Sequence, residues 1–297
     1  MKRQTQSYCY ALITVCLWST VGSASKITLS YITPTQFVFY ASFVSIIVLF
    51  LILLFQGKLG ALLRFNKREI AISMGFGFLN PFAYYLVLFR AYDLLPAQQA
   101  QIINYTWALS MTLLSIPLLK QRVSNKQWFA IITSYIGVLI IATKGRLLSL
   151  EFDDPLGIAL ALGSTIIWAF YWLLNTRDTR DPVLGLFLNF LCAFPMISVY
   201  LYLTEGISFI SIQGLLGAGY IGVFEMGVSF VLWLKAMKLT DSTAKIANLI
   251  FIAPILSLFL IHYLVGEEIL ISTLIGLTLI LVGLGIQAFV KDSQVLK

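Results

Sequence analysis

Long apolar runs alternate with short polar segments along the whole chain. A membrane-spanning helix needs roughly 20 mainly apolar residues, because each residue advances about 1.5 Å through about 30 Å of hydrocarbon. Ten runs approach or exceed that length, so we predict an all-α integral membrane protein with ten transmembrane helices. The predicted helices lie approximately at residues 8–25, 34–55, 70–89, 97–119, 127–143, 155–174, 182–204, 212–234, 243–264 and 272–290.

Composition supports this prediction. Only 11% of the residues are charged and 59% are hydrophobic, whereas soluble domains have about 25% charged residues. The chain therefore cannot cover itself with a polar surface. The 20 Lys and Arg exceed the 13 Asp and Glu, but they lie between the apolar runs, as expected at a membrane interface. We expect the lipid bilayer, and no nucleic acid, as a partner.

The first apolar run could be mistaken for a secretory signal peptide, because Lys2 and Arg3 precede it and small residues end it. We interpret it as a membrane span. Its counterpart at 155–174 is internal and cannot be cleaved, and the two runs share a tryptophan, Trp18 in one and Trp168 in the other.

An internal repeat organises the chain. Residues 90–119 recur 145 residues later, at 235–264. We interpret the repeat as a duplication, with one five-helix repeat at residues 1–145 and a second at 146–297. Because five crossings are an odd number, the second repeat is inverted, and a substrate site is expected in a central cavity near the membrane midplane. The identical pairs are Ala91/Ala236, Leu94/Leu239, Ala108/Ala253, Leu113/Leu258, Ile116/Ile261 and Leu119/Leu264, with Gly77/Gly222 outside that stretch and Gly137/Gly283 after a small gap.

Charge predicts the orientation. If the N-terminus is inside, the inner segments hold 15 of the 20 Lys and Arg, the outer loops hold 4, and Lys245 lies within a helix. Short cytoplasmic loops carry the excess of basic residues, so we expect a multi-pass protein of the plasma (inner) membrane with both termini cytoplasmic. The basic segment 120–122 and its acidic repeat mate 266–268 fall on opposite sides.

Glu225 is the first candidate site residue, because it lies near the middle of the eighth run. A charged side chain at that depth costs about 2.5–3.5 kcal/mol, and its repeat mate is Asn80, also in the middle of a run. Glu225 could contact a substrate amine or carry a coupling proton. The alternative is a structural carboxyl bonded to a neighbouring helix.

Lys245 is the second candidate, at the start of the ninth run. It could bind a substrate carboxylate, or it could extend to the membrane interface. Glu225 and Lys245 together would suit a zwitterion, although the sequence does not tell whether they approach each other.

Polar and aromatic residues share faces of further helices. Such faces must point to protein or water and not to lipid, so they could line the cavity and stack on a substrate. The alternative is packing and interhelical hydrogen bonding, worth about 0.6 kcal/mol for each bond. The candidates are Trp18 in the first helix, Gln98, Gln101, Asn104 and Tyr105 in the fourth, and Trp168 and Tyr171 in the sixth.

The chain resembles the EamA-type branch of the drug/metabolite transporter superfamily. The resemblance rests on the five-plus-five layout, the segment Leu17-Trp18-Ser19-Thr20, Trp168, Pro254 and the Gly266-Glu267 turn. It implies a basket in which helices 1, 3, 4, 6, 8 and 9 line a cavity, and a homodimer through helices 5 and 10.

One segment of the fourth helix narrows this resemblance. Asn104-Tyr105-Thr106-Trp107 is similar to the Asn-Tyr-x-Trp-Pro segment of bacterial aromatic amino-acid exporters, with Ala108 in place of the proline. The similarity adds Trp107 to the candidate site.

We therefore expect a secondary transporter of a small organic metabolite, first of all an amino acid or related amphiphile, working by alternating access and either proton-coupled or facilitative. The alternatives are a lipid-acting membrane enzyme, a translocator of a lipid-like molecule, and an assembly or receptor protein. We expect no catalytic residues, no cofactor and no metal site, since the chain has one histidine and no nucleotide-binding loop.

Overall fold

The computed structural model describes residues 3–120, 123–149, 151–152, 154–175, 177–206, 210–240, 246 and 248–289. In this part of the chain ten segments are long and apolar enough to cross a membrane, which confirms the predicted all-helical fold with ten spans. Spans 1 to 5 are α1 (Arg3–Ser19) with α2 (Val21–Leu29), α3 (Pro34–Phe55), α4 (Lys67–Gly77) with η2 (Phe78–Ala83) and α5 (Tyr84–Leu94), α6 (Ala97–Asn104) with α7 (Trp107–Leu119), and α8 (Asn125–Ala142), and a short helix, η1 (Leu59–Arg64), follows α3. Spans 6 to 10 are α9 (Pro155–Asn175), α10 (Pro182–Thr204), α11 (Ile212–Tyr220) with η3 (Ile221–Ser229) and α12 (Phe230–Leu239), η4 (Asn248–Phe251) with α14 (Ile252–Val265), and α15 (Ile271–Phe289).

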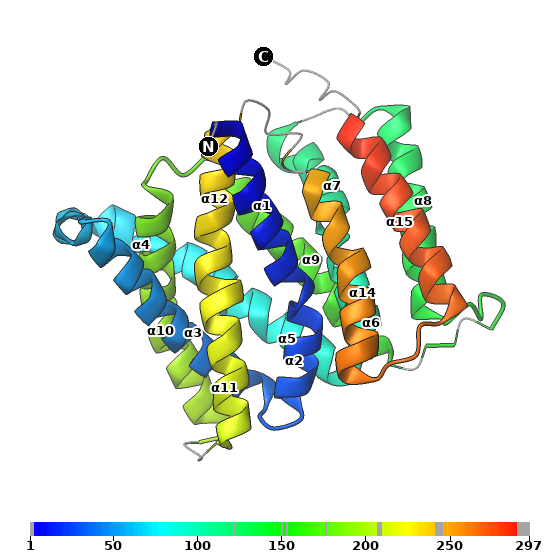
Figure 1. The fold of residues 1–297 in the computed structure, drawn as a ribbon, viewed down its shortest axis with the longest axis horizontal. Helices are drawn as coiled ribbons and strands as arrows, with labels where there is room; N and C mark the ends of the chain where they lie inside the picture. Colours follow the sequence, from blue (N-terminus) through cyan, green and yellow to red (C-terminus); the bar gives the residue numbers. More distant parts are fainter. Residues whose placement is uncertain are drawn as a thin grey trace.

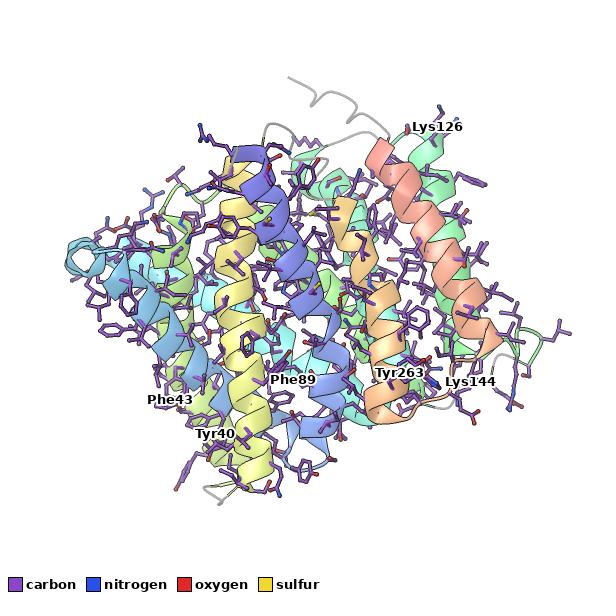
Figure 2. All side chains as sticks on the ribbon, viewed as in Figure 1. Tyr40, Phe43, Phe89, Lys126, Lys144 and Tyr263 are labelled. Carbon is purple, nitrogen blue, oxygen red and sulfur yellow. The ribbon has the colours of Figure 1, made fainter. Side chains whose placement is uncertain are left out.

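The helices form one bundle with two polar ends (Figure 1). We call the end where α1 and α8 begin the near face, and the opposite end the far face. Lys126 and Lys144 mark the two ends of α8 (Figure 2), while α15 runs from the far face to the near face. The fifth and tenth spans are thus antiparallel, as expected if the two halves enter the membrane from opposite sides.

Side-chain caps fix where several spans begin. The side chains of Thr33, Asn66 and Ser124 each accept a hydrogen bond from the backbone N–H three residues later. The side chain of that later residue in turn accepts a hydrogen bond from the backbone N–H of the capping residue. Asp181 caps α10 by accepting from the backbone N–H groups of Val183 and Leu184. These capping boxes satisfy backbone donors that would otherwise be exposed at the membrane interface.

Apolar side chains face both inward and outward. Phe89 is fully buried and stacks on Phe37, with ring centroids 4.0 Å apart, whereas Phe43 on α3 is 47% exposed at the outer surface (Figure 2). Exposed apolar side chains on a membrane helix contact lipid tails. Helix α3 therefore packs on the bundle with one face and on the bilayer with the other.

Two glycines bring the halves of the chain together in equivalent ways. Gly77 in span 3 packs directly on the Asn189 carbonyl of α10, the seventh span. Gly222 in span 8 packs on α3, the second span, where an added Cβ would lie 2.5 Å from the Ala41 carbonyl oxygen. Gly77 and Gly222 are repeat mates, so the third span of each half crosses the second span of the other half.

Glycines also join α8 to α15. A Cβ on Gly137 would lie 2.5 Å from the Gly276 carbonyl oxygen, and one on Gly283 would lie 2.5 Å from the Ala130 carbonyl oxygen. Small residues allow this close backbone approach in membranes. Gly137 and Gly283 thus serve packing within one chain, and the expected dimer could use only the outer faces of these helices.

Candidate functional site

A cavity of about 90 Å³ lies in the middle of the bundle. Its lining comes from spans 1, 3, 4, 6, 8 and 9, the set implied by the family resemblance. This volume is well below the roughly 300–1,000 Å³ of typical ligand pockets, so binding an organic molecule requires the cavity to widen. The lining residues are Trp18, Val21, Tyr84, Leu88, Tyr92, Gln101, Asn104, Tyr105, Trp107, Trp168, Trp172, Glu225, Trp233 and Ile250.

Glu225 contributes the only carboxylate to the described lining of this cavity. Its Oε1 accepts a hydrogen bond from the Tyr85 hydroxyl at 3.1 Å. Its Oε2 is buried and has no hydrogen-bond partner among the described residues. A buried carboxylate oxygen without a donor is costly, so this atom is available to a ligand that brings an N–H or O–H group.

The backbone around Glu225 is not a regular α-helix. Glu225 lies in η3, a π-helical segment, where the Ser229 hydroxyl donates to the Phe224 carbonyl five residues earlier. The repeat mate Asn80 lies in η2, where span 3 is kinked: Asn80 has the non-helical angles φ −146° and ψ 115° and is followed by Pro81. π-Helical segments are rare and frequently occur at functional sites. Each repeat interrupts its helix at the same position, by a π-helical segment in span 8 and by a kink in span 3.

Aromatic rings enclose the cavity. Trp168 stacks on Tyr84 with ring centroids 4.4 Å apart, and Trp18 lies 5.3 Å from Trp233. Phe230 contacts both Trp18 and Trp168, at 6.3 and 5.8 Å. The electron-rich faces of tryptophan and tyrosine attract organic cations, so rings around one carboxylate favour a positively charged group.

Asn104 has a structural role in this conformation. Its Nδ2 donates to the Ser164 hydroxyl at 3.0 Å, and its Oδ1 accepts from the Tyr84 hydroxyl at 3.3 Å. Both ends of its amide are therefore used to hold span 4 against spans 3 and 6. Helix α6 ends at Asn104, and Tyr105 and Thr106 form a turn before α7 begins at Trp107, so the fourth span is interrupted at the cavity.

Of the eleven predicted site residues, the structure brings seven into one cavity and places three elsewhere, and one lies outside the described residues. Gln98 lies at the far face, where its Nε2 donates to the carbonyls of Glu267 and Glu268. Asn80 is fully buried, and neither polar atom of its amide has a hydrogen-bond partner among the described residues. Tyr171 stacks on Trp168 at 5.6 Å but lines a second small cavity. Lys245 lies outside the described residues.

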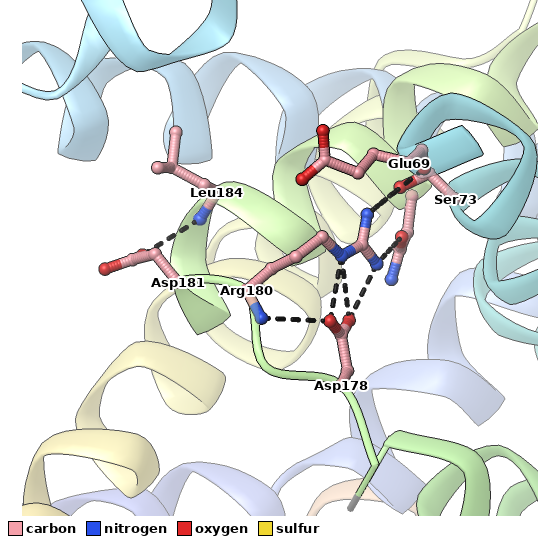
Figure 3. Close-up of polar contacts among 7 residues, drawn as sticks. Glu69, Ser73, Asp178, Arg180, Asp181 and Leu184 are labelled. Carbon is pink, nitrogen blue, oxygen red and sulfur yellow. Dashed lines mark hydrogen bonds and ion pairs between the residues drawn. The ribbon is translucent and has the colours of Figure 1, made fainter. Parts of the chain in front are cut away.

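A nearly buried ion pair at the near face has no counterpart in the sequence predictions. Arg180 donates from Nε and Nη2 to Asp178, with a shortest distance of 2.7 Å, and its Nη1 donates to the Ser73 hydroxyl at 2.5 Å (Figure 3). The two side chains are only 8% and 13% exposed. Burial raises the pKa of the Asp178 carboxyl, but the hydrogen bonds and charge of Arg180 outweigh burial and lower it. The pair lines the second cavity together with Tyr171.

A polar cluster at the far face was also missed. Lys26 at the end of α2 donates from Nζ to the carbonyls of Tyr92 and Leu95, at 2.8 and 2.7 Å. The Glu267 carboxylate accepts from the backbone N–H groups of Ala97 and Gln98, at 2.5 and 3.0 Å. We call Lys26, Glu267 and the backbone of residues 92–98 the far-face clasp. It ties spans 1, 3 and 4 to the turn between spans 9 and 10, one helical turn beyond Gln101 of the cavity.

Ten spans in the described part of the chain, arranged around an aromatic cavity with a buried carboxylate, are the architecture expected of a membrane transport protein. The comparison with known proteins agrees, because residues 5–143 and 155–288 each match the EamA-like transporter family, and the chain belongs to that family. It is therefore a membrane transporter, and the alternative of a lipid-acting enzyme is wrong.

The individual relatives are themselves uncharacterized transporters, so they do not indicate a substrate. The chain is 23% identical to the uncharacterized transporter YyaM of Bacillus subtilis over 87% of this chain and 86% of that protein. It is 21% identical to an uncharacterized transporter of Archaeoglobus fulgidus over 92% and 95%. A relative from Clostridium kluyveri is 26% identical, and the match spans 55% of its length. A solved structure with TM-score 0.67 and 21% identity covers 95% of this chain and 96% of its own, which supports the fold.

Proposed function

We propose that the protein is a secondary transporter of a small amphiphilic metabolite with an amine group, an amino acid or a related compound, and that it works by alternating access. The observation that carries this proposal is the free Oε2 of Glu225 in an aromatic cavity. A substrate ammonium would donate to Oε2, and its apolar part would lie against Trp168 and Trp18. Tyr105 and Trp107 line the same cavity, which supports the proposed similarity to exporters of aromatic amino acids.

The arrangement of the halves supports the proposed mechanism. Repeats 1–145 and 146–297 would move against each other about the crossings at Gly77 and Gly222, opening the cavity to one face at a time. We further propose that the near face is cytoplasmic, because 15 Lys and Arg lie in the segments assigned to that side and 4 in the opposite loops. Transport would be coupled to protons through Glu225 or would follow the substrate gradient.

Transport into proteoliposomes tests the role of Glu225. A panel of labelled amino acids and amines is offered to the wild type, to Glu225→Gln and to the exposed loop control Glu151→Gln, with and without an imposed pH gradient. We expect uptake by the wild type and the control. Glu225→Gln should lose the pH response if Glu225 carries the proton, or all uptake if it binds the amine.

The outcomes separate the alternatives. A thermal melt identifies a variant that fails to fold. Full uptake by Glu225→Gln would refute the assignment of this carboxylate, and no uptake of any amine or amino acid by the wild type would refute the proposed substrate class.

A further inference from the structure

A third hollow, much larger than the two cavities described above, opens on the side of the bundle at the near face. Its volume is about 790 Å³, and it lies between the start of span 3 and the end of span 6. We call it the α4–α9 groove. Its apolar wall includes Ile72 and Gly75 of α4 and Phe170 of α9. Ile72 is 39% exposed, and a Cβ on Gly75 would meet no atom within 4 Å, so the groove is open toward the bilayer.

The rim of the groove carries two free cations. Arg68 in the first turn of α4 and Arg177 in the segment between spans 6 and 7 are both exposed. The guanidinium group of neither arginine forms an ion pair or hydrogen bond with any other residue that the structure describes. The third arginine of the groove, Arg180, is already saturated by Asp178 and Ser73. Two unpaired guanidinium groups on facing elements are suited to hold one phosphate by bidentate hydrogen bonds.

The carboxylates of the groove do not cancel these charges. Asp178 is paired with Arg180. Glu69 accepts from the backbone N–H of Asn66 at 2.9 Å as part of the capping box of α4, so its charge is held at the helix N-terminus. The lining therefore keeps a positive charge at its mouth.

The depth of the groove matches one leaflet. From Arg68 to Leu79, the deepest wall residue in sequence, α4 and η2 rise about 16 Å at 1.5 Å per residue. Half of the hydrocarbon core is about 15 Å thick. The cations thus lie at the depth of lipid head groups, and the apolar wall extends toward the membrane midplane.

We propose that the α4–α9 groove binds one anionic phospholipid from the leaflet at the near face. Arg68 and Arg177 hold the phosphate and its second anionic or polar group, and an acyl chain lies along Ile72, Gly75 and Phe170. The bound lipid bridges the first half of the chain to the segment between spans 6 and 7. This site is separate from the central cavity and does not depend on what the protein transports.

Native mass spectrometry of the full-length protein in detergent tests the proposal. Phosphatidylglycerol and phosphatidylcholine with identical acyl chains are titrated against the wild type and two groove variants. Arg68→Gln/Arg177→Gln removes the cations. Gly75→Leu puts an apolar side chain into the groove at a position where an added Cβ would meet no atom within 4 Å, and leucine favours the helix more than glycine does.

Matched controls separate the groove from general surface effects. Lys235→Gln/Lys238→Gln removes the same charge from exposed positions of α12 outside the groove. Gly219→Leu places the same side chain at another helical glycine with open space around it. Inorganic phosphate is added as a competitor to distinguish a lipid site from a site for free anions.

We expect the wild type and both controls to retain one phosphatidylglycerol in preference to phosphatidylcholine. With about 1 kcal/mol for each basic side chain near an anionic head group, the double arginine variant should bind about 30-fold more weakly. Gly75→Leu should lose retention although both arginines remain, and millimolar phosphate should not displace the lipid. The proposal is overturned if the arginine variant binds like the wild type, if the lysine control weakens equally, if Gly75→Leu retains the lipid, or if free phosphate competes.

Discussion

The Glu267 carboxylate allows a direct test of the far-face clasp. Helix α6 begins after Pro96, which provides no side-chain cap. The cap comes instead from Glu267, about 170 residues later in the chain, whose two oxygens accept from the backbone N–H groups of Ala97 and Gln98. We predict that Glu267→Gln loosens the first turn of span 4, because a glutamine keeps one acceptor oxygen and loses the charge.

The magnitude follows from these two contacts. Losing a helix cap costs about 0.5–2 kcal/mol, and a negative charge at a helix N-terminus contributes about 0.3–1 kcal/mol at exposed positions. Because glutamine can still accept one of the two hydrogen bonds, we expect the free energy that keeps the first turn of α6 closed to fall by about 1–2 kcal/mol. The population in which this turn is open should therefore rise about 5- to 30-fold.

Hydrogen–deuterium exchange of peptides covering residues 97–104 measures this population, since the amides of Ala97 and Gln98 are the protected donors. Glu268→Gln is the control, because its side chain makes no hydrogen bond within the described structure while its backbone carbonyl still accepts from Gln98. Unchanged exchange in Glu267→Gln, or equal acceleration in Glu268→Gln, would refute the capping argument.

Two further predictions concern stability. Gly283→Ala should lower the melting temperature in detergent by the equivalent of about 1–3 kcal/mol, because the new Cβ would lie 2.5 Å from the Ala130 carbonyl oxygen. The control Gly285→Ala, at a glycine with open space around it, should be neutral or slightly stabilising. Equal melting temperatures for the two variants would contradict the packing argument. Asp178→Asn should cost about 1–3 kcal/mol at pH 7 by unpairing Arg180. Because the pKa of Asp178 is lowered below its ordinary value of 3.8, the stabilisation is present above that pH and is lost as the pH falls further. The melting temperatures of the variant and the wild type should therefore converge between pH 7 and pH 3. A constant difference between the two melting temperatures would refute the ion-pair contribution.

The ten spans were predictable because the bilayer imposes one simple demand on length and polarity. The position of Glu225 was predictable for a related reason, since a carboxylate in the middle of a span must face the protein interior. The structure places it in the central cavity beside Trp18 and Trp168, which come from repeat-related helices. In each case a single physical constraint acts on residues that are close in sequence or related by the repeat.

The misplaced and missed residues depend on where chain segments meet. Gln98 shares a helical face with Gln101 on a continuous helix, but it lies one turn nearer to the far face, where Glu267 reaches it. From the sequence, Arg180 is expected to be a solvent-exposed cation in a loop. The structure instead buries it between Ser73 and Asp178. The sequence contains no local signal for either contact, because each partner comes from a distant segment or from a turn of the loop.

The paired helical interruptions of spans 3 and 8 bear on how the two halves diverged. Asn80 and Glu225 are repeat mates, and both interrupt their spans at the same place, yet one carries an amide and the other a carboxylate. The simplest history is that the ancestral five-helix unit already contained the irregular turn, and that the side chains separated after duplication. The irregular backbone of that turn would then be the older feature, and the acidic group a later change in one copy. On that history the interruption of the helix is an inherited frame, and the two copies differ in the one side chain that each places at its centre.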